Sequence, residues 1–145
     1  MMVYGMLAQE WGDQPAETSQ STRMFRVEPV LMVHDVAETV AFYRDKLGFN
    51  IDFVYGEPAN HAGISRGEWT GSTVTIQITQ VPQDRELTVS SYLYIFVDAT
   101  LTELFKQYRD NGVEIVSEPE SKPWGLEEFA IKDLNGHILV FGRYL

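Results

Sequence analysis

Hydrophobic and polar residues recur with two different periods along the chain, and each period predicts a type of element. Residues 28–34 are typical of a strand that ends at Asp35. Residues 36–47 carry apolar side chains at helical spacing, and Gly48 ends this predicted helix. Alternating or apolar segments then predict strands at residues 49–55, 62–66 and 73–79.

The same order of elements starts again in the second half of the chain. A strand is predicted at residues 91–97 and a helix at 100–111, which Gly112 ends. Three further strands are expected near residues 113–115, 128–132 and 137–142. Equivalent positions lie 64 residues apart, as Gly48 and Gly112 do, and 63 apart in the last strand of each half. We interpret this pattern as an internal repeat.

Each half is therefore predicted to fold as a β-α-β-β-β module, which makes the fold class α+β. The modules are expected at about residues 25–80 and 88–143, within one domain spanning residues 24–145. A single helix covers one face of a four-stranded sheet, so the other face must line a cavity or meet another surface. Two such modules side by side predict a curved eight-stranded sheet around a concave cavity, and concave surfaces favour ligand sites.

Residues 1–23 differ from this domain and are interpreted as an N-terminal arm or linker. Residues 14–23 are rich in Pro, Ser, Thr and Gln, which is typical of a linker. The apolar side chains before them favour a short arm, and they are Tyr4, Met6, Leu7 and Trp11. Three partners for this arm stay open, namely a neighbouring subunit, the chain's own domain and a crystal contact.

Charge and cysteine content narrow the classes of partner. The 145 residues include 11 basic and 21 acidic ones, so the formal net charge is −10. This acidity argues against nucleic-acid and anionic membrane partners, and the longest apolar run is far shorter than a membrane span. The start of the sequence has no basic leader of a secretory signal, so we expect a cytoplasmic protein. Since cysteine is absent, thiolate nucleophiles and zinc-thiolate sites are excluded.

Motifs in both modules resemble a known superfamily. The first module contains Val33-His34-Asp35-Val36 and Phe42-Tyr43-Arg44-Asp45-Lys46-Leu47-Gly48-Phe49. The second contains Pro123-Trp124-Gly125, Glu128-Phe129, Asp133-Leu134-Asn135-Gly136-His137 and Phe141-Gly142. These stretches resemble the vicinal oxygen chelate superfamily of glyoxalase I, bleomycin resistance proteins and extradiol dioxygenases, and most of all its bleomycin-resistance-like branch. The resemblance covers about residues 25–143 and implies the fold, while one fold hosts many reactions.

The resemblance also implies where a metal would be bound in the metal-dependent members. The four ligand positions, on the first and last strand of each module, are Glu28, Gln77, Tyr92 and Val140. Tyr92 would need a deprotonated phenol and Val140 has no donor atom, whereas a catalytic site normally uses at least three protein ligands. The histidines are expected at a strand end, in a connector and on the helix side, and they are His34, His61 and His137. We therefore expect no metal and no other cofactor.

Strand alternation predicts which side chains line the cavity instead. The predicted ligand-binding residues on the inner face are Tyr92, Tyr94, Phe96, Gln77, Thr75 and Glu28. Trp124 and Trp69 lie in loops, and either of them is a candidate for a stacking lid. Glu28 and Glu128 supply carboxylates that would offset a cation held against aromatic rings. The alternatives of a plain core or a dimer interface stay open for this aromatic face.

The leading functional hypothesis is a metal-free protein that sequesters an aromatic or cationic small molecule. The bleomycin-resistance-like branch implies such a role in antibiotic resistance, and family members that complete their sites across a two-fold interface imply a homodimer. The alternative is a metal-dependent enzyme of the glyoxalase or dioxygenase type, with non-standard ligands from His34 or His61. A third hypothesis is a protein-interaction module whose inner faces are packed shut, so whether the chain is an enzyme stays open at this point.

Overall fold

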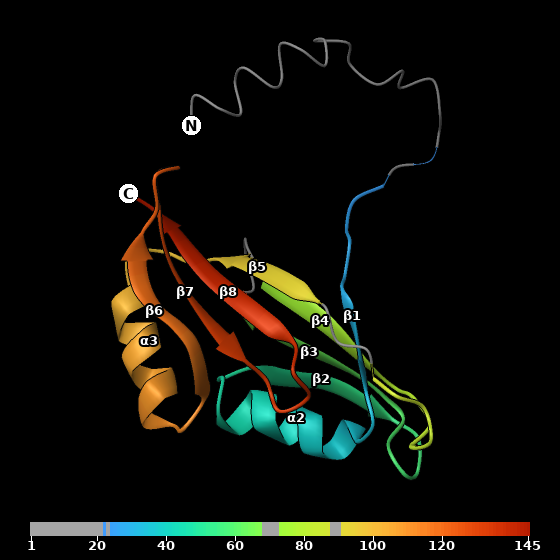
Figure 1. Ribbon diagram of the computed structural model, residues 1–145. Coiled ribbons are helices and arrows are strands. Elements are labelled where there is room, and N and C mark those ends of the chain that lie inside the picture. The colour runs from blue at the N-terminus through green and yellow to red at the C-terminus, as the bar shows by residue number, and fades with distance from the viewer. Residues whose placement is uncertain (1–21, 23, 68–72, 88–90) are drawn as a thin grey trace.

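The computed structural model describes residues 22, 24–67, 73–87 and 91–145 (Figure 1). The predicted arm, except for residue 22 near its end, and Trp69 lie outside the described residues. The strands are β1 (Val30–Val33), β2 (Asn50–Tyr55), β3 (His61–Gly67), β4 (Thr73–Gln80), β5 (Tyr92–Phe96), β6 (Glu114–Ser121), β7 (Leu126–Lys132) and β8 (Ile138–Tyr144). The helices are α2 (Val36–Asp45) and α3 (Leu101–Asp110). Neither of these described helices is long and apolar enough to cross a membrane.

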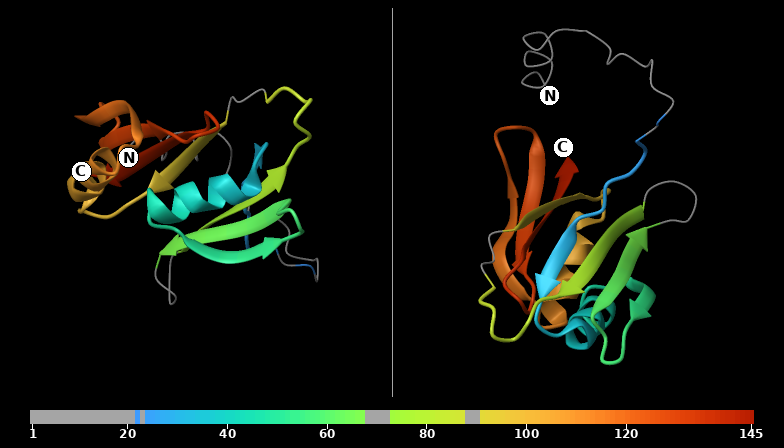
Figure 2. Two further views of the ribbon diagram at one scale, coloured as in Figure 1. Left: turned by 90° about the horizontal axis from the view of Figure 1, so that it is seen from below. Right: turned by 90° about the vertical axis from the view of Figure 1, so that its right-hand side faces the viewer.

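The eight strands form two four-stranded sheets, in the orders β1-β4-β3-β2 and β5-β8-β7-β6. In each module the first and last strands pair in parallel, and the remaining pairs are antiparallel. This confirms the α+β class and the two βαβββ modules. Among the described residues the sheets stay separate and do not join into one eight-stranded sheet, as Figure 2 shows from two further directions.

The repeat is visible in the backbone as well as in the sequence. Gly48 and Gly112 follow α2 and α3 with φ angles of 76° and 78°, a region that favours glycine. Each module also has an irregular step in the pairing of its second strand, between Ile51 and Phe53 in β2 and at the equivalent place in β6. Both features recur 64 residues apart, which supports the interpretation as an internal repeat.

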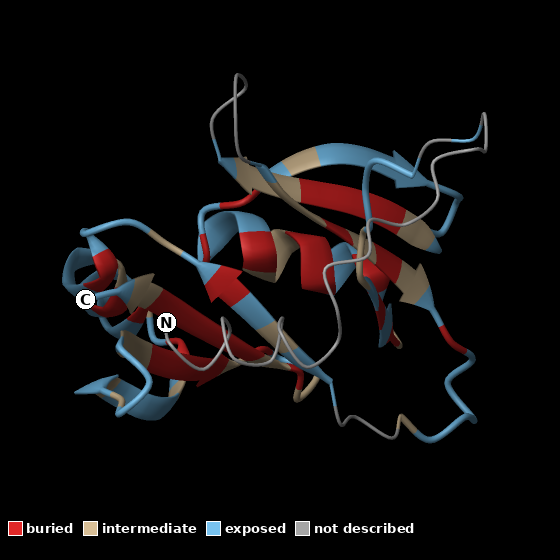
Figure 3. Cartoon of the chain, turned by 90° about the horizontal axis from the view of Figure 1, so that it is seen from above, coloured by how far each residue is buried: buried red, intermediate tan, exposed pale blue. Residues whose placement is uncertain are grey.

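The core lies on the helix side of both sheets. Most strand positions predicted to face the helices are buried, namely Leu31, Val33, Ile76, Ile78, Ile95, Leu139 and Phe141, while Val74, Leu93 and Val97 are partly buried. Aromatic rings fill the second module, where Phe129 and Phe141 stack with centroids 5.1 Å apart. Figure 3 shows buried residues running along the strands and both helices. Each such side chain stabilises the fold by about 2–3 kcal/mol through burial alone.

Two tyrosine hydroxyls join the modules across this core. The hydroxyl of Tyr43 in α2 donates to Asp133 Oδ2 in the β7–β8 turn at 2.8 Å. The hydroxyl of Tyr108 in α3 donates to the carbonyl oxygen of Leu47, beyond the end of α2, at 2.9 Å. Both tyrosines are fully buried. The helix-side faces of the two modules therefore pack on each other, and their inner faces are turned away from this core.

Candidate functional site

The inner face of the second sheet is an open aromatic surface. β5 alternates as predicted, so Ile95 is buried in the core while Tyr92, Tyr94 and Phe96 lie on the opposite face. Tyr144, at the end of β8, joins them. The exposed fractions of these four aromatic residues range from 41% to 73%. Side chains of this size are usually covered, so the face is free to receive a partner.

Three of these rings form a continuous surface, which we call the aromatic platform: Tyr94, Phe96 and Tyr144. Phe96 and Tyr144 stack with ring centroids 5.4 Å apart, and Tyr94 and Phe96 lie 5.0 Å apart. Tyr94 lies over Gly142 of β8, where an added Cβ would come within 2.2 Å of the tyrosine hydroxyl. The glycine therefore lets the ring lie close to the sheet instead of standing away from it.

Carboxylates border the aromatic platform. Across the sheet, Gly142 pairs with Phe96 on one side and with Glu128 on the other, and Glu128 pairs with Glu120. Since paired residues share a face, an acidic edge follows directly after the aromatic rings. Trp124 Nε1 donates to Glu128 Oε1 at 2.7 Å, and this tryptophan is 55% exposed. Such an arrangement suits a flat cation, because rings and carboxylates both attract positive charge.

The inner face of the first sheet is a polar groove of about 700 Å³. Three predicted residues line it together, namely Glu28, Thr75 and Gln77. Glu28 pairs with Arg26 at 2.8 Å and accepts a hydrogen bond from Gln77 Nε2 at 2.7 Å. Gln77 Oε1 lies 3.0 Å from His61 Nε2. These four side chains form one hydrogen-bonded chain across the sheet.

The sequence analysis missed Phe53 in this groove and misplaced His61, which is hydrogen-bonded to the groove residue Gln77. The prediction that His61 lies in a connector is wrong, because it is the first residue of β3 and pairs with Thr79. Phe53 lies over Gly63, where a Cβ would come within 2.3 Å of the ring. The bulge next to Phe53 turns this ring to the inner face, and simple alternation with Ile51 gives no signal of it.

The predicted residues divide into two groups within one chain. Residues before β1 and on β2, β3 and β4 line the polar groove, whereas the aromatic platform belongs to β5 and β8. Glu28 and Glu128 therefore do not share a cavity in the described part of a single chain. Val140 in β8 pairs with Tyr94 and Ala130 and shares their face of the second sheet, but it is only 6% exposed. The two inner faces are separate walls, which need another surface opposite them to enclose a ligand.

The donor atoms do not fit a catalytic metal at the four positions that the resemblance implies. Glu28 and Gln77 are adjacent but bind each other, Tyr92 lies on the other sheet, and Val140 offers no donor. Within the described ranges, no three His, Cys, Asp or Glu side chains form a group that would hold a metal ion. His137 does not help either, since it is buried and its Nε2 lies 3.0 Å from the Met32 carbonyl oxygen.

Comparison with known proteins defines the family. Residues 6–141 match the family described as the Glyoxalase/Bleomycin resistance protein/Dioxygenase superfamily. The chain belongs to this superfamily. Among curated protein sequences, none matches this superfamily member significantly.

Solved structures with a similar fold include binding proteins and enzymes. A bleomycin-binding protein complexed with bleomycin has 23% identity and a TM-score of 0.66, over 84% of this chain and 100% of that chain. TioX from Micromonospora sp. ML1 has 22% identity and a TM-score of 0.63, over 83% and 100%. A glyoxalase-related enzyme from Clostridium phytofermentans has 18% identity and a TM-score of 0.71, over 88% and 100%. At these identities the likeness shows a shared fold only. The function has to be inferred from the residues of the site.

Proposed function

We propose that this superfamily member is a metal-free binding protein that sequesters a flat, cationic aromatic molecule. The observation that carries the proposal is the exposed aromatic platform with the carboxylate of Glu128 in the next position across the sheet. A planar cation stacks on such rings and gains both apolar contact and electrostatic attraction. The net charge of −10 adds a favourable field around the whole molecule. Similar folds in bleomycin-binding proteins are in accord with this class of ligand.

A homodimer is part of the same proposal. Among the described residues, β1 and β5 each pair with one strand only, so each sheet has a free edge beside its inner face. Free edges and exposed inner faces are surfaces that a second copy covers in two-fold symmetric assemblies. We propose that the polar groove of one copy faces the aromatic platform of another and that the ligand binds between them. Sedimentation of the purified protein measures this directly, and a monomer at all concentrations would contradict it.

Binding of ethidium tests the aromatic platform. Phe96→Ala and Tyr144→Ala are each expected to weaken ethidium binding by about tenfold or more, since one stacked ring contributes about 1–3 kcal/mol. Glu128→Gln should weaken ethidium binding but leave a neutral aromatic probe unaffected. Leu134→Ala is the matched control, because this side chain is exposed on the β7–β8 turn. Fluorescence titration gives the dissociation constants, with bleomycin as a second ligand. Equal affinities in Phe96→Ala, Tyr144→Ala and Leu134→Ala would refute the platform as the binding site.

One observation favours a second candidate function. Glu28, Gln77 and His61 lie side by side, and the last of these adds a donor beyond the two oxygen donors found from the sequence. If Gln77 turned aside, these side chains would offer the start of a metal site for a glyoxalase- or dioxygenase-type enzyme. We expect metal analysis of protein purified without chelator to find no bound transition metal. A stoichiometric content of nickel, zinc, manganese or iron, abolished in His61→Ala, would replace the metal-free proposal by this one.

A further inference from the structure

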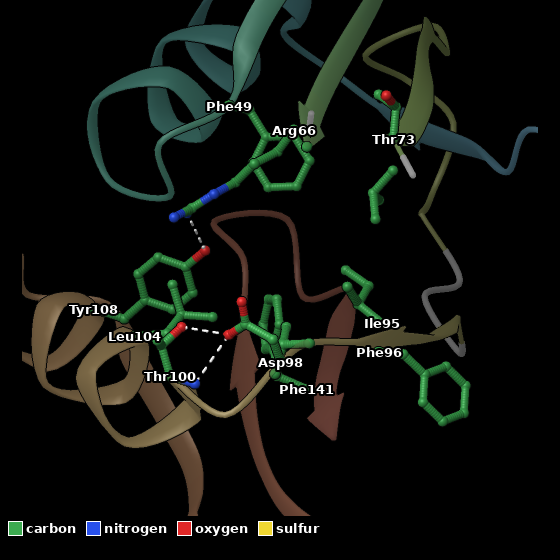
Figure 4. A pocket seen from close by; sticks show the side chains of 13 residues that line it. Phe49, Arg66, Thr73, Ile95, Phe96, Asp98, Thr100, Leu104, Tyr108 and Phe141 are labelled. Atoms are coloured by element: carbon green, nitrogen blue, oxygen red, sulfur yellow. Dashed lines mark hydrogen bonds between the residues drawn. The ribbon is translucent and has the colours of Figure 1, made fainter. Parts of the chain in front are cut away.

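A second pocket lies between the two modules, on the helix side of both sheets. Its volume is about 340 Å³, which is within the range of small-molecule sites. The walls combine polar and apolar side chains, and the apolar ones include Phe49, Val74, Ile95, Val97, Leu104 and Phe141. Figure 4 shows the ring of Phe96 turned away from the Arg66 side of this pocket. The pocket adjoins the aromatic platform through Phe96 and the polar groove through Gly67 and Thr73, whereas Arg66 lines this pocket and belongs to neither of the other two sites.

Arg66 supplies the positive charge of this pocket. Its Nη1 donates to the carbonyl oxygen of Leu47 and to the hydroxyl oxygen of Tyr108, the latter at 3.0 Å. The guanidinium also lies against Gly48, where an added Cβ would be 3.0 Å from Nη1. These neutral contacts fix its position, and no ion pair found among the described residues includes Arg66. Since a guanidinium has five donor hydrogens, several remain for an anionic acceptor.

The carboxylate that lines the same pocket serves another purpose. Asp98 Oδ1 accepts hydrogen bonds from the backbone N–H of Thr100 at 2.9 Å and from its hydroxyl at 2.6 Å (Figure 4). These bonds from Thr100 hold the pKa of Asp98 below its usual value. Because Thr100 is the first residue before α3, Asp98 stabilises the start of the helix. Asp98 keeps its negative charge, but among the described residues no ion pair joins it to Arg66, whose remaining donor hydrogens can meet another acceptor.

We infer that this pocket binds a small organic carboxylate with an apolar body. The carboxylate accepts hydrogen bonds from Arg66, because a guanidinium matches the geometry of a carboxylate and charged hydrogen bonds of this type are strong. The apolar body would contact the apolar side chains of the same pocket, which include Leu104 and Phe141. Ligands of the two sites thus have opposite charge: an anion at Arg66 and a cation at the aromatic platform.

Phenylacetate and its uncharged analogue phenylacetamide test this inference in the full chain. By calorimetry or NMR titration, phenylacetate is expected to bind at least about tenfold more tightly than the amide. Arg66→Gln should remove this preference, whereas Arg44→Gln, on the exposed surface of α2, should retain it. Leu104→Trp keeps Arg66 but fills the pocket, so it should abolish the binding of both compounds. Measurement of the thermal midpoint of Leu104→Trp serves as the control that this variant is folded.

Three results would overturn the inference. The first is equal affinity of phenylacetate and phenylacetamide, including no binding of either. The second is unchanged phenylacetate binding in folded Leu104→Trp, and the third is an unchanged charge preference in Arg66→Gln. Ethidium separates this inference from the proposed function, because Arg66→Gln should remove the preference for phenylacetate and leave ethidium affinity unchanged. Failure of ethidium binding alone would refute the aromatic platform and would leave the Arg66 pocket standing.

Discussion

Asp133→Ala is expected to lower the free energy of unfolding by about 3–4 kcal/mol, because it removes a buried acceptor shared by both modules. Asp133 is 3% exposed. Its Oδ2 accepts the hydroxyl of Tyr43 at 2.8 Å, and its Oδ1 accepts the backbone N–H groups of Asn135 and His137 at 2.9 Å each. Alanine leaves these donors without a partner in a dry environment, and unpaired buried donors are costly.

Thermal and urea unfolding of matched variants measure this effect. Asp84→Ala removes a carboxylate from the exposed connector and should leave the thermal midpoint unchanged. Asp133→Ala should lower it by about 10 °C in a domain of this size. Asp133→Asn keeps one oxygen acceptor and should fall between them, which also covers the case in which the alanine variant does not fold. Coincident unfolding curves for Asp84→Ala and Asp133→Ala would show that this carboxylate does not join the modules.

The sequence was sufficient to predict the architecture because the alternation of apolar and polar residues shows which face of each strand is buried. Alternation placed Leu31 and Ile95 on the helix side and Met32 and Tyr94 on the opposite face, as the structure has them. Repeated glycines after each helix marked the two modules. A side chain's face follows from its position in a strand, so these features depend on local pattern alone.

The site was predicted only in part because its missing members depend on irregular or non-local structure. Phe53 reaches the inner face through a bulge, and a bulge inserts a residue without a sequence signature here. The predicted strand began at residue 62, one residue too late, so it left out His61, which pairs with Thr79 on the face of the sheet that also carries Gln77. The sequence could have predicted Tyr144, since this residue continues the alternation of Val140 and Gly142 along β8.

The relation between the two inner faces was beyond sequence reasoning altogether. Each module specifies its own sheet, but how two modules pack depends on a few contacts far apart in sequence. The hydrogen bond between Tyr43 and Asp133 joins residues 90 positions apart in the sequence, and the one between Tyr108 and Leu47 joins residues 61 positions apart. No periodicity encodes such pairs. The resemblance gave the ligand positions, and it left open whether one chain or two chains bring them together.

The same two tyrosines predict a loss of stability in alkaline solution. Burial raises the pKa of Tyr108 to about 12 against 10.0 for a free tyrosine, although nearby Arg66 opposes the change. Burial also raises the pKa of Tyr43 well above its usual value, and the carboxylate of Asp133 adds to this. The unfolded chain therefore ionises these tyrosines at lower pH than the folded chain. The contribution of Tyr108 is complete below pH 10 and is lost as the pH rises through about 12, and that of Tyr43 is likewise lost in alkaline solution.

The size of this loss of stability, and the variants that test it, follow from the difference in pKa between the folded and the unfolded chain. A pKa difference of about two units corresponds to about 2–3 kcal/mol, so the free energy of unfolding should fall by this order for Tyr108 alone. Tyr108→Phe loses a hydrogen bond and is less stable at neutral pH, but its stability should decline less steeply above pH 10. Tyr55→Phe, at an exposed position, should keep the slope of the parent chain. Urea unfolding at a series of alkaline pH values measures these slopes, and parallel curves for Tyr108→Phe and Tyr55→Phe would contradict the assignment, because only a buried hydroxyl ties ionisation to unfolding.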